Sequence, residues 1–220
     1  MKVIVFACDL YADIAPAYWY LHQKNWPDCP YPVEFVTNSE ELQIDAFVHY
    51  LGHPDLRFGS RLRDFVKNHF GDPNGLMLVM MIDYLIRTSV YQPFIDKAEA
   101  LCKADEIRHV RLKPMPHPPE VYEPDPDFGI IDKKARYSLS LQPGIWDAQL
   151  LHDLCQDDES PYHTETHGSS RVKHQRGMFL SARTPAIVHH NYYKKKRAQD
   201  WAVNWVKANV PKELWPNDCR

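Results

Sequence analysis

Two nearly continuous apolar runs constrain the fold of this chain more than any other feature of its sequence. The first, KVIVFAC, spans residues 2–8, and the second, LMLVMMI, spans residues 76–82. Runs without polar alternation are typical of strands covered on both faces, as in parallel sheets. An acid follows each run at once, Asp9 after the first and Asp83 after the second. We therefore expect an α/β protein whose buried strands end in carboxylates.

Strand and helix patterns alternate along the next part of the chain. We expect further strands at 31–38, 45–52 and 107–112, and helices at 15–26, 60–70 (with Ser60 as N-cap) and 90–106. Short links between alternating elements favour a mostly parallel sheet, which binds ligands beyond the carboxyl ends of its strands. Asp9, Asn38 and Asp83 are expected at those ends.

Later segments are less regular. The six prolines in residues 114–126 predict an extended loop. Residues 137–156 predict a strand, a tight turn at Pro143–Gly144 and a helix that starts near Trp146 and Asp147. Glu165 is expected in a polar loop.

Size and composition favour one soluble domain. The chain has 220 residues, of which 44% are hydrophobic and 25% charged. No apolar run approaches the ~18 residues needed to span a membrane. The first residues lack a signal-peptide pattern, so we expect a cytoplasmic protein. Five scattered cysteines without a CxxC pair are expected to be free thiols.

The net charge of −3 hides an asymmetry. Residues 171–220 hold 11 Lys/Arg against 3 Asp/Glu, a balance of +8, and residues 1–170 hold 15 against 26, a balance of −11. A solvated basic helix and an electrostatic site for phosphate or nucleic acid explain this about equally well. The basic run Lys194, Lys195, Lys196 and Arg197 suits phosphate contacts. Trp201 and Trp205, spaced i,i+4, are expected to form the buried face of a C-terminal helix.

Several short motifs resemble one family. They are ACDLY at 7–11, WPDCPYPVEFVTN at 26–38, LQPGIW at 141–146 and YHTETHGSS at 162–170. Together they resemble small bacterial and viral glycosyltransferase-like proteins with the GT-A fold, over residues 1–172. The resemblance implies a GT-A-like domain at 1–190, with a basic helical extension at 191–220 packed on it. It also implies sugar transfer from a nucleotide sugar, with a UDP-sugar favoured.

The resemblance implies a donor site with a divalent cation, Mn²⁺ or Mg²⁺. The family's strand ends in Asp-Asp-Tyr, whereas this chain has Ile82–Asp83–Tyr84, so one carboxylate of the metal motif is missing. Asp83 and His190, preferred over His189, are the implied ligands; a helix cap or an ion pair would explain Asp83 alone. Asp9, Tyr11 and Asn38 are expected near the base and ribose. Arg61 is expected near the diphosphate, unless it is simply solvated.

For the chemistry, Glu165 matches the family's loop glutamate and is the candidate general base. Asp147 is the second candidate, unless it only caps a helix. Direct attack with one base favours an inverting mechanism. Trp146 is expected either to line the acceptor pocket or to belong to the hydrophobic core.

The acceptor is inferred from the charge pattern. The basic run at 194–197 favours a viral enzyme that glycosylates flipped-out hydroxymethylated pyrimidines in DNA. A cell-surface polysaccharide or a lipid-linked glycan is the alternative acceptor. A non-catalytic nucleotide- or DNA-binding module, and a structural zinc site formed by His152, Cys155, His163 and His167, are rival interpretations.

Overall fold

A mixed sheet forms the centre of the molecule. The computed structural model describes residues 1–53, 56–72, 74–104, 106–194 and 196–219. In these residues nine strands form the main sheet in the order β3-β2-β1-β4-β9-β6-β10-β8-β7. Their bounds are β1 Lys2–Phe6, β2 Val33–Thr37, β3 Phe47–Tyr50, β4 Leu76–Met81, β6 Ile107–Arg111, β7 Glu120–Val121, β8 Phe128–Ile130, β9 Gly144–Asp147 and β10 Met178–Ala182.

The strand directions confirm the predicted α/β class. Strands β3, β2, β1 and β4 are parallel neighbours, and β6 and β10 are also parallel to each other. Strand β9 lies antiparallel between β4 and β6. The start of β9 therefore lies at the same edge of the sheet as the ends of β4 and β6. This edge brings together segments that are far apart in the sequence.

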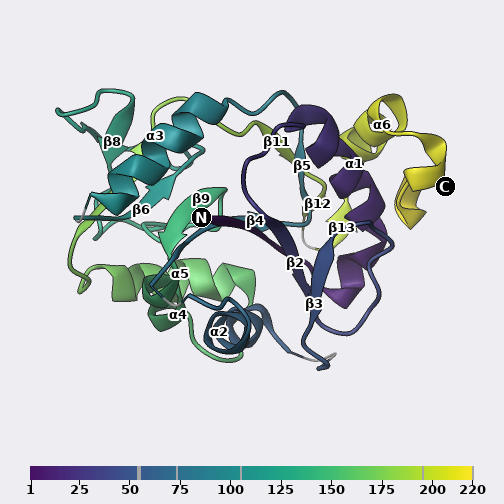
Figure 1. Ribbon diagram of the computed structural model, residues 1–220, viewed down its shortest axis with the longest axis horizontal. Coiled ribbons are helices and arrows are strands. Elements are labelled where there is room, and N and C mark those ends of the chain that lie inside the picture. Colours follow the sequence, from purple (N-terminus) through teal and green to yellow (C-terminus); the bar gives the residue numbers. More distant parts are fainter. Residues whose placement is uncertain (54–55, 73, 105, 195, 220) are drawn as a thin grey trace.

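Helices cover both faces of the sheet (Figure 1). Helices α1 (Ala15–Asn25), α3 (Gln92–Lys103) and α6 (Asp200–Asn209) lie on one side, and α2 (Phe58–Asn68), α4 (Ala148–Leu154) and α5 (Pro161–Val172) lie on the other. Alternate side chains of each central strand enter opposite clusters, because strand residues alternate between faces. In β1, Val3 and Val5 join the first cluster, while Ile4 and Phe6 join the second.

The segment 191–220, expected as an extension, shares the core of the domain. Strand β11 (His189–Asn191) pairs with β5 (Tyr84–Ile86), and β12 (Tyr193–Lys194) and β13 (Arg197–Ala198) form a hairpin. Tyr192, Val206 and Cys219 are buried in the same cluster as α1. Two 3-10 turns, Lys212–Leu214 and Asn217–Cys219, end the described chain.

Four local predictions were wrong. The run 76–86 breaks at Ile82–Asp83 into β4 and β5. Helix α2 starts at Phe58, and the hydroxyl of Ser60 accepts a hydrogen bond from the Asp158 N–H instead of capping it. The strand expected before Pro143 does not form in the described residues; strand β9 follows the turn instead, and the predicted helix then begins as α4 at Ala148, with Asp147 as its N-cap. Glu165 lies on α5, because Pro161 at its first position and the Ser160 cap start a helix there.

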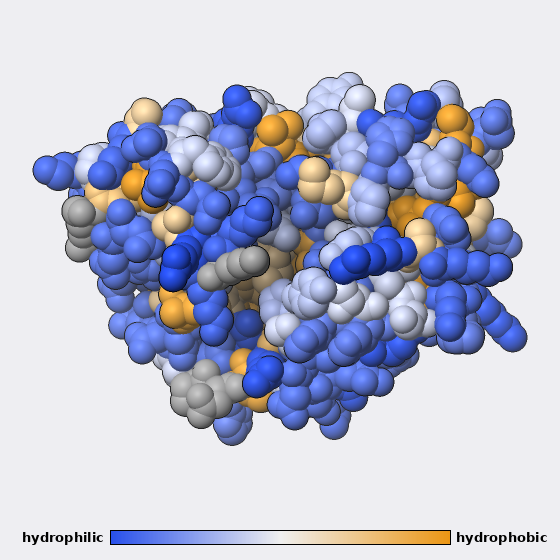
Figure 2. Space-filling model, turned by 180° about the vertical axis from the view of Figure 1, so that it is seen from behind, coloured by the Kyte–Doolittle hydropathy of each residue, from blue (hydrophilic) through white to orange (hydrophobic). Residues whose placement is uncertain are grey.

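None of the helices in the described residues combines the length and the apolar character that a membrane crossing requires. The rear face is mainly hydrophilic, is hollowed near its middle, and carries hydrophobic side chains only in small separate groups (Figure 2).

Candidate active site

A cleft of about 730 Å³ opens beside the carboxyl end of β1. The short 3-10 helix η1 (Asp9–Ile14), the loop after β2, the β12–β13 hairpin and the C-terminal turns line it. Its described lining carries six carboxylates and one cation, Lys196; the acids are Asp9, Asp13, Glu40, Glu41, Glu213 and Asp218. An uncharged group that donates hydrogen bonds suits this lining, and a bare phosphate does not.

Of the predicted residues, Asp9 lines this cleft, and Asn38 holds the loops after β2 and β3. The Asp9 carboxylate accepts hydrogen bonds from the Ser39 N–H (2.9 Å), the Ser39 hydroxyl (2.6 Å) and the Glu40 N–H (2.9 Å). Burial raises the pKa of Asp9, but these hydrogen bonds outweigh it and hold the pKa below its usual value. The Asn38 amide donates to the carbonyls of His53 and Leu56, both at 2.9 Å. Asp9 and Asn38 therefore fix the loops that follow β2 and β3.

Tyr11 already has an aromatic partner. Its ring stacks on Tyr193 with a centroid distance of 4.1 Å and an angle of 12°. Tyr193 comes from the hairpin near the C-terminus, and both rings line the cleft. Tyr11 was predicted near the nucleotide from its position after the first strand. Tyr193 was not predicted, because only the tertiary fold brings it next to Tyr11.

Arg61 is a buried cation under the ends of β1 and β2. Its side chain is on α2 and only 5% exposed, and no described residue accepts a hydrogen bond from its Nε or Nη1. Burial lowers the pKa of Arg61, whereas the nearby Cys8 and Asp9 raise it. A buried guanidinium with unused donors is suited to an anion.

Asp83 lies half-buried in the turn between β4 and β5. Burial raises its pKa to about 7, and hydrogen bonds from its own N–H and the Tyr193 N–H offset this only in part. Ile82, at the place of the missing acid, is 2% exposed and belongs to the core. Asp83 is therefore the one acid that the end of β4 presents.

The two histidines of β11, His189 and His190, face different surroundings. His190 lies edge-on to Trp201 (4.6 Å) and Trp205 (5.0 Å) of α6. His189 instead stacks on Tyr84 at 4.3 Å and 18°. Strand neighbours point to opposite sides, which explains the difference. Trp201 is 49% exposed, so only part of the predicted tryptophan face is covered.

His189 joins a polar cluster at the carboxyl edge. Its Nε2 lies 3.1 Å from Gln142 Oε1 and 3.2 Å from Lys113 Nζ. Burial, helped by Lys113 and His190, lowers the pKa of His189 to about 3, so the ring is neutral. Burial also lowers the pKa of Lys113. The sequence analysis missed Lys113 and Gln142; their positions, just after β6 and just before β9, were the available signal.

The implied metal site does not fit this arrangement. Asp83 and His190 face different surroundings, and the Lys113 ammonium lies 3.2 Å from Nε2 of His189, where a metal ion would have to bind. Within the described residues no three His, Cys, Asp or Glu side chains are grouped so that they could hold a metal ion. The same finding removes the zinc interpretation, since Cys155 is fully buried in the core.

Glu165 reaches the same edge from α5. Its Oε1 accepts hydrogen bonds from the Leu141 N–H (2.8 Å) and the Ser140 hydroxyl (3.1 Å). Burial raises the pKa of Glu165, and these hydrogen bonds and the charge of Arg111 counteract it. Tyr84 is close enough for the Glu165 charge to raise its pKa. Glu165 therefore lies near the Tyr84–His189 stack.

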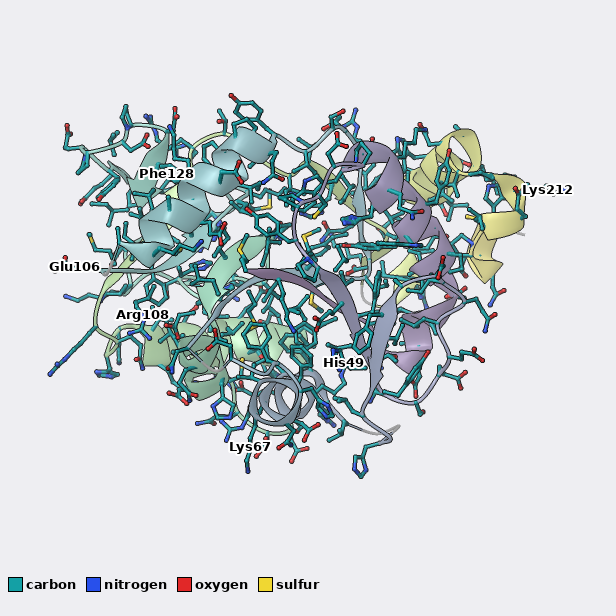
Figure 3. The ribbon with its side chains drawn as sticks, viewed as in Figure 1. His49, Lys67, Glu106, Arg108, Phe128 and Lys212 are labelled. Carbon is teal, nitrogen blue, oxygen red and sulfur yellow. The ribbon has the colours of Figure 1, made fainter. Side chains whose placement is uncertain are left out.

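Asp147 and Trp146 lie away from this cluster. Asp147 pairs with Leu76, the first residue of β4, and so occupies the opposite edge of the sheet. It accepts the Leu150 N–H (2.7 Å) as the N-cap of α4 and forms an ion pair at 3.0 Å with Arg108, a residue of β6 that is labelled in Figure 3. Trp146 is fully buried and stacks on His109 at 3.5 Å. The structure thus gives Asp147 a capping role and Trp146 a core role.

The predicted basic run lies on the β12–β13 hairpin. Lys194, Lys196 and Arg197 are exposed, and Lys196 lines the acidic cleft. Lys195 lies outside the described residues. Two other cations of residues 171–220 contact other side chains. Arg171 forms an ion pair with Glu159 at 2.7 Å, and Lys207 lies over the Trp215 ring.

Comparisons with known proteins identify the fold. No protein-family model matches this sequence, and no curated protein sequence matches it either. Among solved structures, residues 1–349 of Staphylococcus aureus TarS align with 85% of this chain at 13% identity and a TM-score of 0.56. This chain spans 59% of that TarS chain and 40% of a longer TarS chain.

A second solved structure covers nearly the whole chain. It is a 4-diphosphocytidyl-2C-methyl-D-erythritol synthase, aligned over 96% of this chain and 99% of its own at 10% identity and a TM-score of 0.50. The galactosyltransferase LgtC aligns over 97% and 98% at 12% identity, with a TM-score of 0.44. The likenesses to TarS and to the synthase, with TM-scores of 0.56 and 0.50, show that the fold is GT-A-like.

Proposed function

We propose that this protein is an enzyme that transfers a sugar from a nucleotide sugar to an acceptor hydroxyl. Glu165 carries the proposal. It is a carboxylate held at the carboxyl edge of a GT-A-like sheet, where such sheets bind their ligands. Both of its hydrogen bonds end on Oε1, and none of the described residues bonds Oε2. Oε2 is therefore available to a substrate proton.

The reaction needs few protein groups. The acceptor oxygen attacks the anomeric carbon, its proton passes to Oε2 of Glu165, and the bond between the anomeric carbon and the diphosphate oxygen breaks. A nucleoside diphosphate leaves with that electron pair. The raised pKa of Glu165 makes it a stronger base than an exposed glutamate, which favours the proton transfer. One displacement with one base inverts the anomeric centre.

The charges of the cleft orient the donor. Base and ribose are uncharged, and their N–H and O–H groups suit the carboxylates of the cleft, with a UDP-sugar favoured. The diphosphate is negative and must lie away from those acids. We propose that it contacts two cations outside the cleft lining: Arg61, which is buried on α2 near Cys8 and Asp9, and Lys113, which follows β6.

For the acceptor, the dispersal of positive charge favours a glycan hydroxyl. The DNA hypothesis rested on the +8 balance of residues 171–220. In the structure Arg171 is paired with Glu159, Lys207 covers Trp215, and Lys196 sits among carboxylates. DNA binding requires Lys and Arg side chains that neutralise several phosphates together. We therefore propose a polysaccharide or lipid-linked glycan acceptor.

The test compares two variants with acceptors of both kinds. Glu165→Gln should lower the transfer rate about 10²- to 10⁴-fold while donor affinity is retained, as expected for a general base. Asp157→Asn, an exposed acid before α5, is the matched control and should transfer normally. Proton NMR of the product should show inversion. Full transfer by Glu165→Gln would refute the assignment of the base.

Transfer to hydroxymethylated DNA but not to glycans would overturn the acceptor proposal. Neutralising Lys194, Lys196 and Arg197 would then separate the two explanations, because a phosphate-binding hairpin should lose DNA affinity with a reduced salt dependence. Donor binding without turnover on any acceptor would favour a nucleotide-binding module.

A further inference from the structure

The ammonium group of Lys113 lies beside the histidine that a metal ion would need. Lys113 follows the end of β6 and Gln142 precedes β9, so the antiparallel position of β9 brings both to the carboxyl edge. Nζ of Lys113 lies 3.2 Å from Nε2 of the neutral His189. A divalent cation bound to that nitrogen would meet the lysine charge at close range.

His189 holds Lys113 in place. Its ring is fixed by stacking on Tyr84. With the ring hydrogen on Nδ1, Nε2 accepts one hydrogen bond from the ammonium group, and the Gln142 side chain then lies beside Nε2 without accepting a hydrogen bond from it. No other described residue bonds Nζ of Lys113, so two of its N–H donors remain for a ligand. The side chain is half-buried, which makes its charge more effective than that of a fully solvated lysine.

We propose that Lys113, positioned by His189, takes the place of the divalent cation and neutralises the departing diphosphate. This inference rests on the proposed sugar transfer. As the bond to the anomeric carbon breaks, its electron pair remains on a diphosphate oxygen, and the Lys113 ammonium stabilises that charge without giving up its proton. The missing carboxylate at Ile82 fits this inference, because one acid at Asp83 repels the diphosphate less than two would.

Nucleotide binding provides a test that does not require turnover. Calorimetry should compare UDP with UMP, which lacks the terminal phosphate. Lys113→Met should weaken the affinity for UDP about 10- to 100-fold, as expected for the loss of one charge-assisted hydrogen bond. The affinity for UMP should be unchanged. Lys113→Arg should restore part of the loss. Lys103→Met, which removes an exposed lysine paired with Glu99 on α3, is the matched control.

His189→Gln tests the positioning role. It should weaken the affinity for UDP less than Lys113→Met does. The double variant should bind UDP no more weakly than Lys113→Met alone, since His189 acts through the lysine. Additive losses would contradict that role. Circular dichroism should confirm that each variant is folded before its affinity is compared.

The inference also predicts how metal ions affect the protein. Affinity for UDP and turnover of the donor should be the same in EDTA and in Mn²⁺. Turnover that EDTA abolishes and Mn²⁺ restores, or UDP affinity that Lys113→Met leaves unchanged, would overturn the inference while sugar transfer stands. UDP binding without donor turnover in EDTA and in Mn²⁺ would instead refute the proposed function.

Discussion

The carboxyl group of Asp83 should make the stability of this protein depend on pH in a defined direction. Burial raises its pKa from 3.8 to about 7. The unfolded chain loses the Asp83 proton near pH 4, whereas the folded protein keeps it until about pH 7. Below pH 4 the protonated Asp83 does not lower the free energy of unfolding. As the pH rises from 4 to 7, keeping Asp83 protonated in the folded state lowers the free energy of unfolding by a growing amount. Folding stability should therefore fall between pH 4 and pH 7.

The magnitude follows from the size of the shift. A change of about three pKa units corresponds to at most about 4 kcal/mol, and about 2–3 kcal/mol is expected because the side chain is half-buried and partly solvated. Asp83→Asn removes the ionisation and keeps an oxygen that can accept the Tyr193 N–H. This variant should be more stable than the wild type by that amount above pH 7 and nearly equal to it at pH 4.

Urea unfolding followed by tryptophan fluorescence measures the difference across this range. The exposed Asp28 provides the control, since Asp28→Asn removes a carboxylate from the surface and not from a half-buried turn. A difference between wild type and Asp83→Asn that stays constant from pH 4 to pH 8 would refute the reasoning. So would a wild type that is the more stable of the two at pH 8.

Three further substitutions separate structural from catalytic roles. Asp147→Ala removes the α4 cap and the ion pair with Arg108, so it should cost about 1–2 kcal/mol in urea unfolding, and donor turnover below the unfolding transition should be unchanged. Trp146→Ala should cost about 3–5 kcal/mol, measured in the same way, because the ring is fully buried against His109. His190→Ala should leave UDP affinity unchanged in calorimetry with Mn²⁺; a large loss would restore His190 as a metal ligand.

Periodicity predicted the sheet well because its signal is local. The apolar runs at β1 and β4 need only hydrophobic burial to form strands, and the acids that follow them, Asp9 and Asp83, lie at the carboxyl edge as expected. The motifs in the first 172 residues also indicated the GT-A-like fold, which the solved structures support.

The site was harder to predict because it depends on pairing between distant segments. Strand β9 is antiparallel to its neighbours, and this alone sends Asp147 to the far edge and brings Gln142 to the near one. The register of β11 against β5 decides which histidine faces Tyr84. A shift of one residue would have exchanged His189 and His190. No pattern within either strand carries that information.

The central claim is best tested by offering the protein a panel of nucleotide sugars with glycan acceptors and measuring nucleoside diphosphate release and the glycosylated product. The wild type should form product from one donor, a UDP-sugar, in the presence of EDTA, and Glu165→Gln should bind this donor without transferring its sugar. Equal product formation by both proteins, or donor binding without any product from the wild type, would contradict the central claim.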